Sequence, residues 1–377
     1  MAGVPAWLLA ILVGGGTVYC VLTVAAALRY LSQTKPPTSN TEPVSILKPL
    51  AGADEGLREN LRSFFEQDYP RFEIFFAVRA STDPAVAIVE ELRRQYPEVP
   101  SELIITGEPP YPNAKIFSLA RMLEHSRYSL VVMSDSDIRV GRDFLRRVAA
   151  EFACPQLALA TCPYRAVPGP SLWSTLEAIG MNTEFLAGVL VARMLEGMKF
   201  AVGPTIVARR NALDAIGGVE SLRDYLAEDF VMGQRAAEKG LGVDLSQTVV
   251  EHRIGAQGFR ANAAHRLRWS RSTRRSRPYG YLGQVFTNPL PLAVLLTVLR
   301  PAWWPVLASA AVFRAWAAYA TAGLILRDPL TARKWWLIPL QDVASLIFWI
   351  LGFFGNTIQW RGRKYYLRRD GRFEPVN

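Results

Sequence analysis

The two ends of this chain are apolar enough to cross a membrane and its middle is not, and this asymmetry limits the possible folds more than any other feature. Val4 to Leu28 contains no charged residue, and about 20 apolar residues are enough for a helix to span the hydrocarbon core. The run is too long for a cleaved signal peptide and has no basic residues before it. We therefore expect residues 1–31 to form a retained transmembrane anchor.

Three further apolar segments occupy the last third of the chain. Residues 278–299 carry no charge, residues 301–326 are interrupted only by Arg314, and residues 335–360 only by Asp342. Because a charged side chain is costly in hydrocarbon, both should face other parts of the protein or reach the interface. The sequence predicts a membrane region of two or three spans over 278–360, followed by a basic tail over 361–377.

The basic residues bear on the topology. The net charge is +10, and arginines are dense at 266–277 and 361–369. Next to membrane spans such charge favours the cytoplasmic side and anionic headgroups, rather than nucleic acid, as its partners. If all three C-terminal segments crossed, the tail would end on the opposite side. Pro289 and Pro291 make the first segment a candidate for an interfacial or re-entrant element, so three or four spans in total remain open.

The middle of the chain, residues 32–277, alternates predicted strands and helices. This order predicts an α/β domain with a mainly parallel sheet. The segment 171–199 is apolar and helical, and either packs in the core or lies against the bilayer and admits a lipid. The predicted strands are 44–47, 72–78, 103–105, 130–133, 157–161 and 200–208, and the predicted helices are 56–67, 84–96, 114–125 and 229–239.

Acidic residues follow several of these elements. Asp135 and Asp137 come directly after the strand 130–133, where open α/β sheets bind ligands, and their oxygens suit a hard cation that would neutralise a diphosphate. A solvated turn or a helix cap is the alternative. Asp83 and Asp229 each stand at the start of a predicted helix, where an N-cap role competes with a binding role. Arg268 and Trp269 precede the membrane region, where interfacial anchoring is the competing interpretation.

In the order and spacing of these residues the chain resembles the ceramide glucosyltransferase family, which are inverting lipid glycosyltransferases with a GT-A domain, including a bacterial branch that glycosylates hopanoids. The resemblance runs nearly end to end. The matching segments are 48–50, 64–70, 83–84, 135–140, 227–230, 268–269 and 360–363.

The resemblance implies a role for each of these residues. Asp83 contacts the nucleotide. Asp135 and Asp137 lie at the ribose and diphosphate with a divalent cation, Mg²⁺ or Mn²⁺. Asp229 is the general base, and Arg268 and Trp269 close the site beside the diphosphate of a UDP-sugar.

Two histidines and a lysine leave alternatives open. Lys115 either adds charge near the nucleotide or is a solvated helix residue, and His252 either completes a metal shell or simply ends a strand. His265 stands where the family has Gln or Arg, which leaves its contact open. The histidine that eukaryotic sphingolipid enzymes carry in the segment matching 181–190 is absent, which puts ceramide in doubt as the acceptor.

We expect a membrane enzyme that moves glucose or N-acetylglucosamine from a UDP-sugar to a hydroxyl of a membrane lipid, such as a hopanoid polyol or a ceramide-like lipid. The catalytic domain, 32–277, should be cytoplasmic, and the branch resemblance suggests a bacterial inner membrane. The alternatives are transfer to a polyprenyl phosphate, and an inactive GT-A scaffold or transport partner. The intact set of acids argues against the inactive scaffold.

Overall fold

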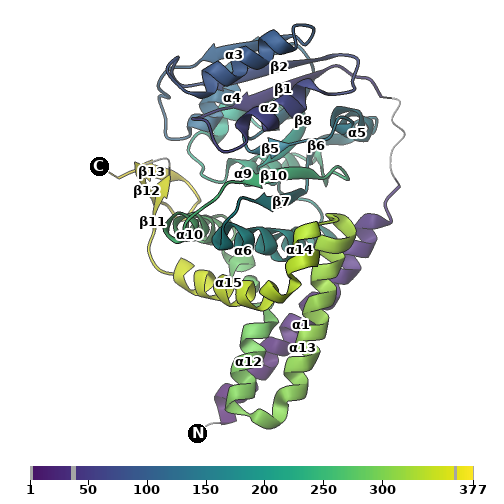
Figure 1. Cartoon of the computed structure of the whole chain (residues 1–377), viewed down its shortest axis with the longest axis vertical. Helices are drawn as coiled ribbons and strands as arrows, with labels where there is room; N and C mark the ends of the chain where they lie inside the picture. The colour runs from purple at the N-terminus through teal and green to yellow at the C-terminus, as the bar shows by residue number, and fades with distance from the viewer. Residues whose placement is uncertain (1–2, 35–39, 361–362, 377) are drawn as a thin grey trace.

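The computed structural model describes residues 3–34, 40–360 and 363–376. The polar, proline-bearing segment 36–40 is predicted to be a linker, and its residues 36–39 lie outside the described residues, as do the first two residues of the basic tail. A seven-stranded sheet forms the centre of the globular part (Figure 1), and in spatial order its strands are β3 (Ser101–Ile105), β2 (Phe72–Val78), β1 (Val44–Pro49), β4 (Leu130–Ser134), β8 (Thr205–Arg209), β6 (Leu157–Thr161) and β9 (Gly242–Leu245).

The prediction of an α/β domain with a mainly parallel sheet is confirmed. β1 runs parallel to both β2 and β4, and β2 runs parallel to β3. β8 is the exception, because it runs antiparallel to β4 and β6. β8 begins at Thr205, so the front of the predicted strand 200–208 is a loop.

Both faces of the sheet are covered. Alternate residues of a strand point to opposite faces, so they pack into two different cores. Ile46 and Val132 belong to the core on one face, with Phe64 of α2, whereas Leu47 and Met133 belong to the core on the other. The helices around this sheet are α2 (Leu57–Phe65), α3 (Ala85–Gln95), α4 (Ala114–His125), α5 (Phe144–Glu151), α8 (Arg210–Ala215) and α9 (Glu228–Glu238).

A small second sheet connects this domain to the helices below it. β10 (Val250–Ile254) lies between β5 (Ile138–Arg139) and β7 (Tyr164–Pro168). Below it run α6 (Leu172–Gly180) and α10 (Phe259–Ser276) (Figure 1).

The apolar segment 171–199 forms α6, a π-helical turn (Met181–Phe185) and α7 (Leu186–Glu196). Most of its side chains are buried against other parts of the protein, while Leu172 and Leu195 remain exposed. Core packing therefore explains much of its apolarity, and the interpretation as a surface against the bilayer stays a prediction.

The N-terminal helix and two C-terminal helices form a bundle that extends away from the globular part (Figure 1). Val13 packs there with Leu290 and Ala310. The bundle and the turns that join it are α1 (Gly3–Leu31), α11 (Pro278–Gly283), a 3-10 turn (Gln284–Phe286), α12 (Pro289–Leu299), α13 (Trp304–Ala318) and a second π-helical turn (Tyr319–Ile325).

Within the part of the chain that the structure describes, three helical stretches are long and apolar enough to cross a membrane, namely Ala6–Leu31, Leu172–Glu196 and Pro329–Gly352. The count is four if the pair Pro278–Phe286 and Pro289–Leu299, bent by 52°, forms one span. The bend falls at the prolines that suggested a re-entrant or interfacial element.

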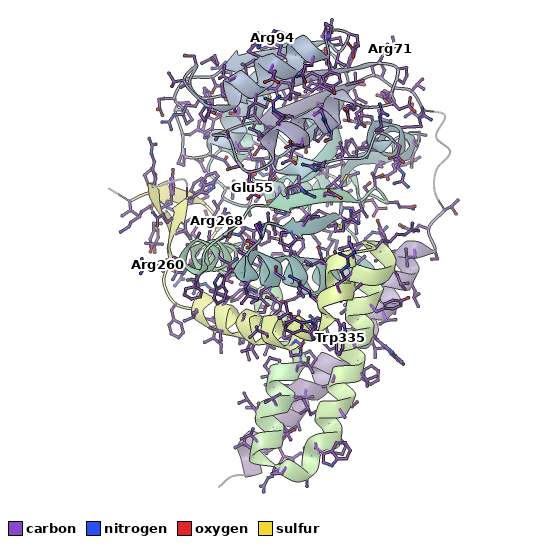
Figure 2. All side chains as sticks on the ribbon, in the orientation of Figure 1. Glu55, Arg71, Arg94, Arg260, Arg268 and Trp335 are labelled. Atoms are coloured by element: carbon purple, nitrogen blue, oxygen red, sulfur yellow. The ribbon has the colours of Figure 1, made fainter. Side chains whose placement is uncertain are left out.

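The last apolar segment packs against the globular part. Leu337 and Ile338 contact Leu176 and Ile179 of α6, and α15 (Ile338–Gly352) runs across the base of the globular part below α6 and α10 (Figure 1). Exposed Trp335 lies where the globular part meets the bundle (Figure 2), as expected of an amphipathic ring at an interface.

The basic tail is folded onto the globular part. Phe373 N donates to Asp224 O at 2.9 Å, and Arg271 Nη1 donates to Thr357 O at 2.6 Å. The tail therefore lies on the same side as the sheet, which removes the conflict with the positive-inside rule. Its strands are β11 (Thr357–Trp360), β12 (Arg363–Leu367) and β13 (Phe373–Pro375).

The two charges in the apolar segments pair with each other. Arg314 Nε and Nη2 lie 2.9 and 2.8 Å from the carboxylate oxygens of Asp342, and both residues are buried. The expectation that they face other parts of the protein is correct.

Candidate active site

The predicted acids lie along one edge of the sheet, because parallel strands bring their carboxyl ends together. Asp135 and Asp137 follow β4, and Asp83 follows β2. The Asp83 carboxylate accepts hydrogen bonds from Gly52 N at 3.0 Å and from Ala85 N at 2.9 Å. Asp83 therefore does cap the start of α3, as its alternative interpretation held, and it also lines the shared cavity described below.

A chain of charges links α4 to α9. Lys115 Nζ lies 2.7 Å from Asp135 Oδ1 and 3.1 Å from Glu228 Oε1. Burial alone would lower the pKa of Lys115, but these carboxylates hold it above its ordinary value. Burial raises the pKa of Asp135, and the Lys115 ammonium opposes this. Lys115 is therefore an enclosed cation of the site and not a solvated helix residue.

Asp137 is paired with a histidine that sequence analysis favoured only as a strand end. Its Oδ2 lies 3.0 Å from His252 Nε2, because β5 and β10 pair in a register that sets His252 opposite Ile138. Burial would raise the pKa of Asp137, but His252 and Lys48 hold it below its usual range. Among the described residues, Asp137 Oδ1 and His252 Nδ1 are buried without a hydrogen-bond partner.

Lys48 at the end of β1 is a site residue that sequence analysis noted only as part of a motif. Its side chain is fully buried, its Nζ donates to Asp135 O and to Ser134 Oγ, and it lies 4.0 Å from the centre of the Phe64 ring. Burial lowers the pKa of Lys48 to about 7. The available signal was an ionisable residue within an otherwise apolar strand.

Asp229 lies in the first turn of α9. It is not the N-cap of this helix, because Ala227 occupies that position. A Cβ added at Gly203 would lie 2.7 Å from Asp229 Oδ2, so glycine leaves the room for this carboxylate. Burial, and after it the neighbouring Glu228 carboxylate, raises the pKa of Asp229 to about 7. At neutral pH this carboxyl can both accept and release a proton.

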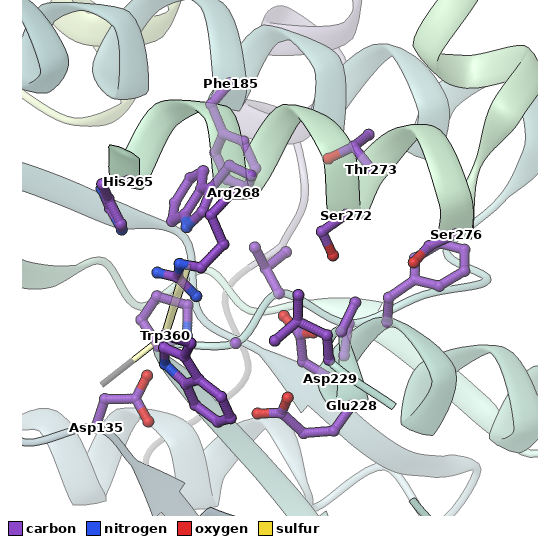
Figure 3. A pocket seen from close by; sticks show the side chains of 18 of the residues that line it. Asp135, Phe185, Glu228, Asp229, His265, Arg268, Ser272, Thr273, Ser276 and Trp360 are labelled. Atoms are coloured by element: carbon purple, nitrogen blue, oxygen red, sulfur yellow. The ribbon is translucent and has the colours of Figure 1, made fainter. Parts of the chain in front are cut away.

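Helix α10 supplies the opposite wall. Figure 3 shows Arg268 pointing into the pocket beside His265 and Trp360, with Asp135 and Asp229 across from it. The contact that sequence analysis left open for His265 is with Glu177, whose Oε1 lies 2.6 Å from His265 Nδ1.

Aromatic contacts hold the second α10 residue. The Trp269 ring lies 5.2 Å from the His265 ring and 5.9 Å from that of Phe185. Trp269 is therefore partly buried among protein side chains, and it lines the cavity described below.

One cavity of about 1440 Å³ is lined by most of these side chains, whereas Lys48 lies behind its wall and is not part of the lining. It continues downward between the helices, so the charged edge of the sheet and the bundle share one space. Its lining includes Asp83, Lys115, Asp135, Asp137, Asp229, Arg268 and Trp269 at the sheet, and Tyr19, Leu22, Phe286 and Gln341 at the other end.

Comparisons with known proteins agree with this geometry. The family model described as glycosyl transferase family 21 matches residues 7–373. Ceramide glucosyltransferase 1 of Caenorhabditis elegans is 29% identical over 205 residues, which cover 54% of this chain and 44% of that protein. Ceramide glucosyltransferase 3 of the same organism is 24% identical over 343 residues, covering 88% and 74%. The match thus spans less than half of the first relative.

A solved structure shows the same fold. The mannosyltransferase PcManGT from Pyrobaculum calidifontis, determined with GDP-Man and Mn²⁺, is 19% identical with a TM-score of 0.56, and the match covers 93% of this chain and 99% of that one. Since the family model matches almost the whole sequence, this chain belongs to glycosyl transferase family 21 and is a glycosyltransferase of the GT-A fold.

Proposed function

We propose that this protein transfers a hexose, glucose or N-acetylglucosamine, from a UDP-sugar to a hydroxyl of a membrane lipid with inversion at the anomeric carbon. One observation carries the proposal: the cavity that contains the acids at the sheet edge also reaches Tyr19 of α1 and Phe286 beside α12. A water-soluble donor and a lipid acceptor can therefore meet in it. The names of the C. elegans relatives support a lipid acceptor.

The sheet edge is the donor half. We assign Asp83 and Lys115 to the nucleotide and Asp135 to the nucleotide and the cation. Among the described residues, no three His, Cys, Asp or Glu side chains are grouped to hold a metal alone. A cation that binds a diphosphate needs only one or two carboxylates, and buried, unpartnered Asp137 Oδ1 fits that role. The chemistry that such an Mg²⁺ or Mn²⁺ supplies is neutralisation of charge on the diphosphate.

Asp229 acts as the general base. The acceptor oxygen attacks the anomeric carbon opposite the diphosphate, its proton passes to the Asp229 carboxylate, and the bond from the anomeric carbon to UDP breaks. A pKa of about 7 suits a base that works at neutral pH. Arg268 and Trp269 on α10 close the cavity beside the departing UDP.

The bundle around α1, residues 1–31, serves as anchor, and the apolar helices over 278–360 hold the enzyme to the bilayer. The sheet and the basic tail lie on the same side of this bundle. By the positive-inside rule we place this side in the cytoplasm of a bacterial inner membrane. A hopanoid polyol or a ceramide-like lipid is the proposed acceptor.

Replacing the base tests this function. Asp229→Asn should reduce the rate of UDP release and of glycolipid formation on the order of 10² to 10⁴-fold, while UDP still binds in a calorimetric titration. Asp214→Asn, an exposed residue outside the cavity, is the matched control and should leave both rates unchanged. If the Asp229→Asn variant turned over at the wild-type rate, Asp229 would not be the base. If the wild-type enzyme never released UDP, the proposed function would be wrong.

A further inference from the structure

The lower half of the cavity contains an acid that the transfer chemistry does not use. Glu184 lies in the π-helical turn Met181–Phe185, which interrupts the α6–α7 helix. Its Oε1 lies 2.9 Å from Thr287 Oγ1 and 2.8 Å from Asn288 Nδ2, and its Oε2 accepts from Ser345 Oγ at 2.6 Å. Such turns are frequent at functional sites because they redirect side chains.

Three polar atoms around this acid lack partners among the described residues, namely Gln341 Oε1, Tyr19 Oη and Asn288 Oδ1. The hydrogen bonds fix the Gln341 amide: Ser345 gives its proton to Glu184, so it must accept from Gln341 Nε2, which lies 2.8 Å away. Gln341 is completely buried. Both Gln341 and Tyr19 line the cavity. Buried polar atoms almost always have a partner, so Gln341 Oε1 is a vacant acceptor for a ligand.

The same π-helical turn also contacts the aromatic residues beside the charged end of the cavity. Phe185, the residue after Glu184, stacks on Tyr164 at 5.4 Å and contacts Trp269 at 5.9 Å. A molecule bound at Glu184 would therefore lie below the closing residues of α10, in the same cavity as Asp229.

The charges at this end select the ligand. Arg266 donates to Ser345 Oγ at 3.1 Å, and its guanidinium lies over the Phe348 ring at 4.8 Å. Its charge balances that of Glu184. The vacant Gln341 Oε1 can only accept and therefore calls for a hydroxyl or amide donor, whereas the Tyr19 hydroxyl can donate or accept. A phosphate would bring a second negative charge and no donor to Gln341 Oε1.

We propose that Glu184, Gln341 and Tyr19 form the subsite that holds the headgroup of the acceptor, and that it selects a neutral lipid with several hydroxyl or amide donors over a lipid phosphate. The inference rests on the proposed lipid glycosyl transfer and names its acceptor class.

Two variants of the full-length enzyme in detergent test the subsite. Gln341→Leu and Tyr19→Phe each remove one polar contact, and each should raise the KM for a neutral lipid about 3- to 10-fold, the effect of a single hydrogen bond. The KM for UDP-sugar and the affinity for UDP should not change. Tyr319→Phe on the exposed side of the bundle is the matched control. Since Tyr19→Phe removes a single oxygen, it keeps the test valid if Gln341→Leu fails to fold.

The acceptors to compare are ceramide, diacylglycerol, a hydrocarbon polyol and polyprenyl phosphate. Transfer to one or more of the neutral lipids, weakened in both variants, supports the subsite. Transfer to polyprenyl phosphate alone, or an unchanged lipid KM in both variants, overturns it and leaves the glycosyltransferase assignment intact. Absence of UDP release with every lipid would instead refute the proposed function.

Discussion

Replacing Glu228 by glutamine should move the pH dependence of the reaction while keeping its shape. Glu228 precedes Asp229, and burial together with the Glu228 carboxylate raises the pKa of Asp229 to about 7. The variant also loses the 3.1 Å ion pair between Glu228 and Lys115, but the 2.7 Å contact of Lys115 with Asp135 remains. It therefore removes one negative charge beside the base and keeps Lys115 in place.

The size of the effect follows from Coulomb's law. For two unit charges on neighbouring residues, taken as about 6 Å apart, the interaction is roughly 0.7 kcal/mol in water and roughly 2.8 kcal/mol at an effective dielectric constant of about 20. These energies correspond to about 0.5 to 2 pH units. A base with a raised pKa is inactive below that pKa, so wild-type activity should rise as the pH passes through about 7. In Glu228→Gln the rise should come about 0.5 to 2 units lower.

The assay is kcat/KM for the lipid acceptor, measured from pH 5 to 9 at constant ionic strength with saturating UDP-sugar. Glu238→Gln, at the exposed far end of the same helix, is the control and should show the wild-type profile. A rise that stays at the wild-type pH in Glu228→Gln, or moves to higher pH, would refute the assignment of that rise to Asp229.

Three other variants probe the structure around the site. Gly203→Ala should lower kcat at least tenfold with UDP affinity retained, since its Cβ would lie 2.7 Å from Asp229 Oδ2; unchanged kcat in a steady-state assay would contradict this packing. Arg314→Met should destabilise the detergent-solubilised protein by about 3–5 kcal/mol, because it leaves Asp342 buried without its partner. The double variant with Asp342→Leu should recover most of the lost stability, as measured by thermal unfolding. Phe373→Ala should release the tail, which trypsin digestion followed by mass spectrometry would detect, and a tail as resistant as the wild-type one would show that the buried ring is not what holds it.

Much of the fold could be predicted from the sequence, because local signals agree with the tertiary structure there. The strand 72–78 and the helix 114–125 were predicted with the bounds the structure has, since an apolar run or an amphipathic repeat specifies each. The start of the sheet's antiparallel strand was missed, because Phe200 and Ala201 are buried in a loop, and burial without regular pairing produces the same apolar pattern.

The candidate site divides in the same way. Asp83, Asp135 and Asp229 were predictable because each follows a strand or opens a helix at a recognisable spacing. The pairing of Asp137 with His252 was not predictable, because it depends on the register between β5 and β10. The two residues are 115 positions apart in the chain. Glu184 gave no local signal, since its importance comes from Ser345 on α15 and Asn288 at the N-cap of α12, which reach it only in the folded protein.

The sequence alone determined that a polar α/β domain is attached to apolar helices at both ends, because composition and periodicity are local properties. Tertiary structure alone decided that the last apolar segment packs beneath the domain and that the charged edge of the sheet and the helical bundle share one cavity. The physical reason is that a cavity and the charges facing it are set by contacts between segments distant in sequence, and no single segment encodes these contacts.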